Sequence, residues 1–162
     1  IMHESGSIIS GSAALWFIHR QAGWFLHDID LYVAFSLYEF VINQLLVAFP
    51  HALVIIGRCF VGRYSTGPSI CQVVQFITDR GRIDIVCSRT ESPLFPISHF
   101  WSTLVMNFVS ADTFGSAYPA LTLRRCGLLS PYRPFGVKEM AVKVKYEAQS
   151  YEFGVRWNIW ED

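Results

Sequence analysis

The strongest constraint on the fold is a pair of apolar, β-prone segments separated by a tight turn. Residues 70–78 read ICQVVQFIT and residues 82–88 read RIDIVCS, and the turn between them, DRG, ends in glycine. Segments rich in Val and Ile that flank a short turn containing glycine predict a β-hairpin. We therefore expect an antiparallel pair of strands here and a sheet that includes it.

Further elements are expected before this hairpin. Serine capping predicts a helix over residues 10–19, and apolar residues at helical spacing predict a second helix over residues 37–46 that ends before Pro50. Between these helices, residues 28–34 (DIDLYVA) begin with alternating polar and apolar residues and predict a strand. Another β-prone run begins at residue 51.

The second half of the chain is expected to be mainly helical. We expect an amphipathic helix over 98–110, a helical middle in 117–131, and a helix at the start of 140–158 that ends near Gly154. These elements predict an α+β fold, a small mixed β-sheet flanked by helices. A length of 162 residues suits one domain over 1–162, with a core over about 7–110 and a helical C-terminal part over about 111–162.

Composition narrows the classes of partner. The 13 basic and 13 acidic residues cancel, so no net charge draws this chain to nucleic acid. Hydrophobic residues make up 52% and charged residues only 16%, which fits either a dense core or an interface exposed in part of a larger protein. Because the first residue is Ile1 rather than Met, we expect a fragment of a longer chain.

Cysteine spacing and hydropathy bear on location. Cys59, Cys71, Cys87 and Cys126 form no C-x-x-C pair and have no histidines at zinc-finger spacing, so buried free thiols in a reducing compartment are expected. The most apolar region, residues 31–57, is too interrupted by polar residues to span a membrane. We therefore expect no membrane partner and a cytoplasmic or nuclear, intracellular location.

Two aspartates on the predicted strand 28–34 are the first candidates for chemistry. Asp28 and Asp30 lie two residues apart, so their side chains share one face of a strand. Neighbouring carboxylates repel one another unless a cation neutralises them, and magnesium prefers such hard oxygen ligands. The alternative is a pair of solvated surface aspartates.

Asp84 strengthens the metal hypothesis. It lies in the apolar strand RIDIVC, where a carboxylate is costly unless it is paired or bound to metal. If this strand lies beside the first, the three carboxylates can hold two metal ions of the kind used in phosphoryl transfer. Asp84 could also help to deprotonate an acceptor hydroxyl.

The segment ISGSAAL offers a partner for phosphate. Gly11 permits a close backbone approach, Ser12 adds a hydroxyl, and the amides that open the following helix favour anions. Ser65 and Thr66 in YSTG could also approach the nucleotide, or could simply form a turn. Arg124 could steady a triphosphate, or could lie on a solvated helix face.

The ordered set ISGSAAL, HDIDLYV and RIDIV resembles the nucleotidyltransferase fold of the DNA polymerase beta superfamily over about residues 7–88. In that pattern, Gly-Ser follows an apolar residue, two aspartates lie on the next strand, and a third carboxylate lies on a later strand. Here RQAGWF at 20–25 looks like an insertion. Through YSTG, HFWSTLVMNFVS and YPALTLRRCGL, nearly the whole chain is also similar to uncharacterised fungal proteins with this fold.

The resemblance implies a nucleoside triphosphate donor and a magnesium cofactor, with two ions at the site and Mn²⁺ as an alternative. It implies transfer of a nucleoside monophosphate to a hydroxyl of an unspecified acceptor, such as RNA, a small molecule or a protein. Asp28, Asp30 and Asp84 would bind the metal, whereas Gly11, Ser12, Ser65, Thr66 and Arg124 would contact the nucleotide. Many members of this superfamily have lost catalysis, so a silent protein-interaction module is the alternative. The sequence leaves the oligomeric state open.

Overall fold

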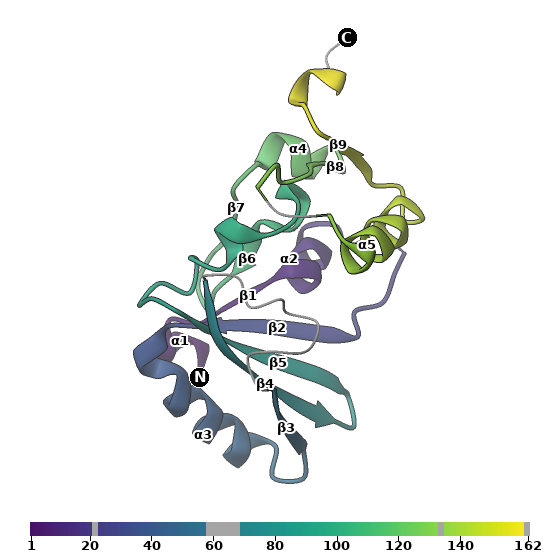
Figure 1. Ribbon diagram of the computed structural model, residues 1–162. Helices are drawn as coiled ribbons and strands as arrows, with labels where there is room; N and C mark the ends of the chain where they lie inside the picture. Colours follow the sequence, from purple (N-terminus) through teal and green to yellow (C-terminus); the bar gives the residue numbers. More distant parts are fainter. Residues whose placement is uncertain (21–22, 58–68, 133–134, 161–162) are drawn as a thin grey trace.

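A seven-stranded mixed sheet organises this protein, seen in a computed structural model that describes residues 1–20, 23–57, 69–132 and 135–160 (Figure 1). The strand order is β3-β4-β5-β2-β1-β6-β7, and β8 pairs with β9 in a separate two-stranded sheet. The expected α+β class is confirmed. The strands are β1 (Ile8–Ser10), β2 (Asp28–Val33), β3 (Leu53–Gly57), β4 (Ile70–Thr78), β5 (Gly81–Ser88), β6 (Asn107–Val109), β7 (Phe114–Ser116), β8 (Cys126–Leu128) and β9 (Glu152–Gly154).

Five α-helices accompany the strands in the described part of the chain. They are α1 (Met2–Ser5), α2 (Gly11–Ile18), α3 (Tyr38–Ala48), α4 (Pro119–Leu123) and α5 (Val137–Glu147). The helices expected over 10–19 and 37–46 are therefore present as α2 and α3, with small shifts at their ends. Short 3₁₀ helices add Phe35–Leu37, Ile97–His99, Thr103–Val105 and Trp157–Trp160.

The centre of the sheet combines antiparallel and parallel pairing. β4 and β5 form the expected antiparallel hairpin, and β3 adds to the outer edge of β4. β2 pairs with β5 in parallel, with Asp30 opposite Asp84. Side chains on adjacent strands at the same register point to the same face. Residues far apart in sequence are therefore aligned across the sheet.

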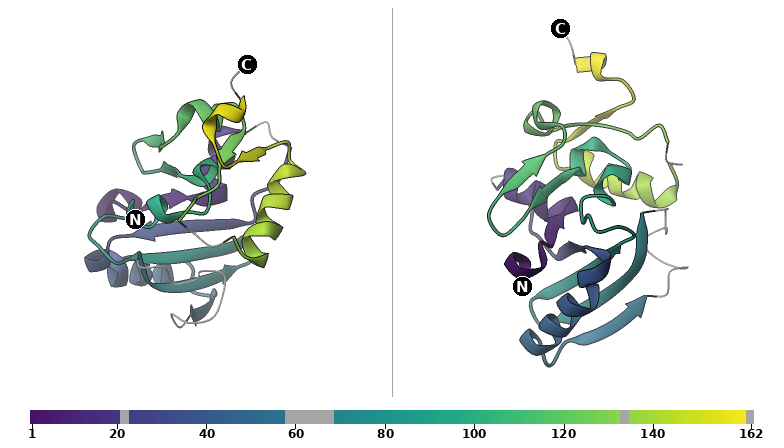
Figure 2. Two further views of the ribbon diagram at one scale, coloured as in Figure 1. Left: turned by 45° about the horizontal axis from the view of Figure 1, so that its top comes forward. Right: turned by 90° about the vertical axis from the view of Figure 1, so that its left-hand side faces the viewer.

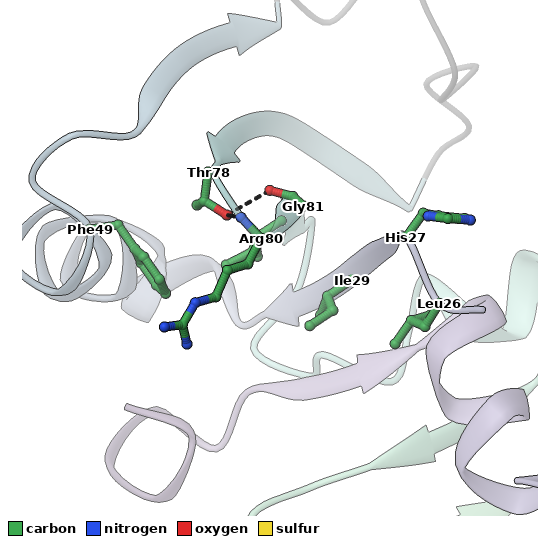
Figure 3. Close-up of a pocket in the computed structure, with 8 residues that line it drawn as sticks. Leu26, His27, Ile29, Phe49, Thr78, Arg80 and Gly81 are labelled. Carbon is green, nitrogen blue, oxygen red and sulfur yellow. Dashed lines mark hydrogen bonds between the residues drawn. The ribbon is translucent and has the colours of Figure 1, made fainter.

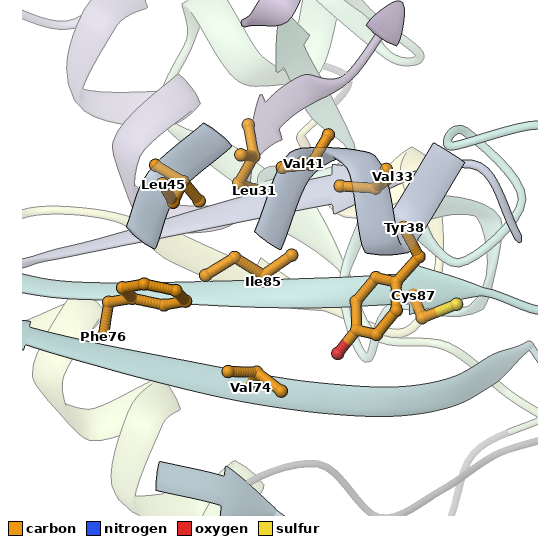
Figure 4. Close-up of a cluster of buried hydrophobic side chains, with 9 residues drawn as sticks. All are labelled: Leu31, Val33, Tyr38, Val41, Leu45, Val74, Phe76, Ile85 and Cys87. Atoms are coloured by element: carbon orange, nitrogen blue, oxygen red, sulfur yellow. The ribbon is translucent and has the colours of Figure 1, made fainter. Parts of the chain in front are cut away.

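One face of the sheet packs against α3 and forms the largest described core cluster (Figure 4). The apolar residues that alternate with the aspartates of β2 and β5 point to this side. The helix contributes Val41 and Leu45, both buried. The buried members of the cluster are Leu31, Val33, Tyr38, Val41, Leu45, Val74, Phe76, Ile85 and Cys87.

The opposite face is covered by elements from both ends of the chain (Figure 2). Leu15 of α2 packs in a cluster with Leu104, Val105, Tyr146 and Tyr151. The C-terminal half thus docks on α2 rather than forming a separate layer on the α3 side. α3 and α5 lie on opposite sides of the central strands (Figures 1 and 2).

The helix expected over 98–110 is wrong. Ser102 is extended, and its hydroxyl accepts a hydrogen bond from the amide of Leu104, which begins a single 3₁₀ turn. The chain then enters β6, where Phe108 pairs with Ser10 of β1. Pairing with a strand almost a hundred residues earlier overrides a helical spacing of apolar residues, which is only a local preference.

The expected helical character of the C-terminal part is only partly correct. The segment 117–131 contains α4, but the chain leaves this helix at Arg125, which has a positive φ of 59°, and enters β8. The segment 140–158 contains most of α5 and then β9. Among the described residues, no helix has the length and apolar character needed to cross a membrane.

Candidate functional site

The three aspartates singled out by sequence lie on one face of the sheet, opposite α3. Asp28 and Asp30 alternate on β2, and Asp30 is the register partner of Asp84 on β5. Asp84 is completely buried, with 0% of its side chain exposed, whereas 29% of the Asp28 side chain is exposed. Parallel pairing of β2 and β5 therefore brings the three carboxylate-bearing positions together.

Arg82 is the charged residue in this group that the sequence analysis did not single out. It is the register partner of Asp28 and, two residues before Asp84, lies on the carboxylate face. Its Nη2 lies 2.5 Å from Oδ2 of Asp28, and its Nε lies 2.9 Å from Oδ1 of Asp84. One guanidinium thus bridges two of the three carboxylates. The sequence R-I-D, which sets Arg82 two residues before Asp84 on one strand, could have predicted that the two side chains share a face.

Gln75 supplies a further contact to the buried carboxylate. Its side-chain amide donates a hydrogen bond of 3.1 Å to Oδ1 of Asp84, because Gln75 and Asp84 are partners in the β4–β5 ladder. A buried carboxylate is tolerated when charge pairs and hydrogen bonds replace its hydration. Arg82 and Gln75 provide that replacement for Asp84.

The Gly-Ser pair faces this group of carboxylates. Gly11 begins α2 with a left-handed φ of +65°, a conformation that favours glycine. A Cβ atom built on Gly11 would lie 2.9 Å from Oδ2 of Asp30. The backbone at the start of α2 therefore approaches the Asp30 carboxylate as closely as the absence of a side chain allows.

Tyr146 of α5 adds a cover that the sequence analysis missed. It is buried, and the Ser12 side chain is among the groups that act on its hydroxyl. Burial raises the pKa of Tyr146 above its usual value, and the negative charge of Asp30 raises it further. α5 therefore buries a phenol that stays neutral and that senses the charge of Asp30.

The other predicted nucleotide contacts are not brought to this site. Arg124 is exposed at the end of α4, and its Nη2 donates a 3.1 Å hydrogen bond to the carbonyl of Trp160. α4 packs with β7 and β8, at the opposite end of the molecule from α3 (Figure 1). Ser65 and Thr66 lie outside the described residues.

The donor set has the chemistry of a magnesium site. Carboxylate oxygens are the ligands that this hard cation prefers, and Asp28, Asp30 and Asp84 present them from adjacent strands. In the described part of the chain, however, no three His, Cys, Asp or Glu side chains are arranged to hold a metal ion. Two of the carboxylates contact Arg82 instead. The residue types therefore fit the cation, and Arg82 lies among these carboxylates.

A small pocket lies on the other face of the same strands (Figure 3). Ile29 and Ile83 form its floor, since they alternate with the aspartates, and Phe49 closes one side. His27, Thr78 at the end of β4 and Arg80 of the hairpin turn supply its polar side chains. The sheet separates this mainly apolar pocket from the carboxylates.

Comparisons with known proteins do not assign the chain to a family. No protein-family model matches it, and no curated protein matches it.

Proposed function

We propose that this protein is a metal-dependent nucleotidyltransferase that moves a nucleoside monophosphate from a nucleoside triphosphate to a hydroxyl acceptor. The observation that carries the proposal is the register of Asp30 with Asp84, with Asp28 on the same face. The close approach of Gly11 to Asp30 supports it, because that approach sets the amides of a helix start beside the carboxylates.

The proposal gives each group a role. Asp28, Asp30 and Asp84 would hold Mg²⁺, or Mn²⁺ in its place, and the bound ions would neutralise the charge that develops on the phosphate oxygens. Gly11 and Ser12 would bind donor phosphate oxygens through backbone amides and the Ser12 hydroxyl. Tyr146 would orient that hydroxyl, because the two side chains interact.

The reaction balances without a further reactant. The acceptor oxygen bonds to the α-phosphorus, the bond from that phosphorus to the β-phosphate oxygen breaks, and pyrophosphate leaves. The acceptor proton passes to a carboxylate. Because Asp84 is fully buried whereas Asp28 and Asp30 are partly exposed, we assign proton acceptance to Asp28 or Asp30 in place of Asp84, the residue that the sequence suggested for this role. The acceptor is RNA, a small molecule or a protein.

Transfer of label tests this proposal directly. The full chain is incubated with α-³²P-labelled ATP, CTP, GTP or UTP, Mg²⁺ or Mn²⁺, and separate pools of RNA, small hydroxyl compounds and protein. We expect metal-dependent label in one pool and its loss in Asp30→Asn. The matched control is Asp79→Asn, because Asp79 is an exposed aspartate of the hairpin turn. Equal labelling by both variants, or none by the wild type in any pool, contradicts the proposal.

Arg82 favours a second candidate function, a catalytically silent domain that binds another protein. Its bridge between Asp28 and Asp84 lets the three aspartates act as a structural ion-pair network. The edge strand β3 also exposes apolar side chains, with 63% of Leu53 and 67% of Ile56 accessible. This candidate predicts that Asp28→Asn lowers stability and that equilibrium dialysis detects no nucleotide binding with or without Mg²⁺.

We propose an intracellular location, cytoplasmic or nuclear. Two buried cysteines, Cys87 and Cys126, carry free thiols in the described structure. Free thiols are typical of proteins in a reducing compartment. Fractionation of cells that express the full-length protein tests this assignment, and recovery of the protein in the secreted fraction contradicts it.

A further inference from the structure

We propose that Arg82 is an internal cation that competes with the divalent metal ion for the carboxylates of the site. Loading of metal then requires the guanidinium to leave Asp28 and Asp84. The inference rests on one part of the proposed function, namely that these carboxylates bind a divalent cation, and does not require nucleotide transfer to occur.

The contacts of Arg82 carry the first step. Its two contacts, from Nη2 to Asp28 and from Nε to Asp84, go to oxygens that a metal ion at this site would need. A guanidinium at 2.5–2.9 Å from these oxygens and a metal ion at coordination distance cannot use them together in the same directions. Binding of one cation therefore opposes binding of the other.

Burial carries the second step. Asp84 has no exposed surface, so its carboxylate needs a positive partner in the folded protein. Arg82 fills that requirement before metal binds, and a metal ion would fill it afterwards. The competition thus keeps the buried carboxylate paired in both states.

Exposure carries the third step. The Arg82 side chain is 21% exposed and its partner Asp28 is 29% exposed, so this bridge reaches the surface at one end. A long arginine side chain can keep its stem packed while its charged end turns to water. Release of the guanidinium therefore requires rotation of one side chain, and the ladder of β5 stays intact.

Manganese binding measures the competition without reference to activity. Free Mn²⁺ is followed by electron paramagnetic resonance during titration of the full chain, as wild type, Arg82→Gln and Arg80→Gln. Arg80 is the matched control, because it is exposed in the adjacent turn and lies on the other side of the sheet, in the small pocket. We expect Arg82→Gln to bind Mn²⁺ at least tenfold more tightly than the wild type and Arg80→Gln to stay within about twofold of it.

Thermal unfolding gives a second measurement on the same proteins. We expect Arg82→Gln to melt below the wild type in EDTA and to gain more in Tm from saturating Mn²⁺, since bound metal stabilises the folded state by mass action. If Arg82→Gln is unfolded in EDTA, circular dichroism should show that Mn²⁺ restores its structure. Equal Mn²⁺ affinity in wild type and Arg82→Gln, or an unfolded variant that Mn²⁺ does not restore, overturns the inference.

The two proposals fail separately. Tighter Mn²⁺ binding by Arg82→Gln without labelling of any acceptor would overturn nucleotidyl transfer and leave the competition intact. Metal-dependent labelling with unchanged Mn²⁺ affinity in Arg82→Gln would overturn the competition and leave the transferase intact.

Discussion

Gly11 and Asp30 approach so closely that a methyl group on Gly11 would lie 2.9 Å from Oδ2 of the aspartate. The chain reaches this position with a positive φ, at the first residue of α2. Two separate features therefore require glycine at position 11: the left-handed backbone conformation and the close approach to Asp30. The protein contains a second glycine that has only the first feature, which allows the two to be measured apart.

Gly11→Ala should destabilise the fold more than Gly6→Ala. Gly6 has a similar φ of +57°, but a Cβ there meets nothing within 4 Å, so its substitution carries only the backbone cost of about 1–2 kcal/mol. Gly11→Ala adds the contact with Asp30, for a further cost of about 1–3 kcal/mol. Urea unfolding of both variants measures the difference. Equal losses would show that Asp30 moves away without cost.

Asp84→Asn should lower the free energy of unfolding by about 3 kcal/mol, because it removes one partner of a buried ion pair and leaves the other charged. The double variant Arg82→Met with Asp84→Leu should lose less than the sum of the losses of the single variants Arg82→Met and Asp84→Leu, since the double variant removes both charges of this pair. Chemical denaturation of the wild type, Arg82→Met, Asp84→Leu and the double variant gives the coupling energy. A coupling energy near zero would mean that Arg82 and Asp84 contribute to stability independently of one another.

His19 should make stability fall as the pH decreases below about 6.5. Burial lowers the pKa of His19, and the nearby positive charge of Arg125 lowers it further, so the fold favours the neutral ring. A lowered pKa means that the unfolded chain binds more protons, so stability is present above the unfolded pKa and is lost on acidification. The ring also stacks on Tyr151. Thermal melts between pH 7.5 and 5 should show a shallower decline in His19→Gln than in wild type.

Cys87 should be inert toward thiol reagents in the folded protein. Burial raises its pKa to about 12, so the reactive thiolate is scarce at pH 8. Titration with a disulfide reagent should give the same count of fast-reacting thiols for wild type and Cys87→Ser under native conditions. In urea the count for Cys87→Ser should be lower by one. A native count that falls in Cys87→Ser would contradict the protected state.

The elements that sequence predicted well are those governed by local pattern. Two β-prone runs and the turn between them predict the β4–β5 hairpin, and the spacing of apolar residues predicts α3. β1 has only three residues and is held by β2 and β6, so no local pattern reveals it. The error at 98–110 has the same origin, because the pairing of Phe108 with Ser10 is not local.

The candidate site divides in the same way. Alternation along β2 predicted that Asp28 and Asp30 share a face, but the place of Asp84 depended on parallel pairing that sequence alone does not fix. The two-residue spacing from Asp84 predicts that Arg82 lies on the same face of β5. Its ion pair with Asp28, however, joins β5 to β2, and the sequence alone does not show that these strands are neighbours. Tyr146 comes from a helix near the C-terminus, and only the packing of α5 reveals its contact with Ser12.

The parallel pairing of β2 with β5 also has a consequence for the order of events during folding. Asp28 and Arg82 are separated by 54 residues, so the chain must close a long loop before they meet. The hairpin β4–β5 is local and can form early, whereas the step that joins it to β2 is slow because its entropy cost precedes its contacts. Since that step also aligns the three aspartates, the carboxylate group is a late product of folding, and a nascent chain that ends before β5 lacks it.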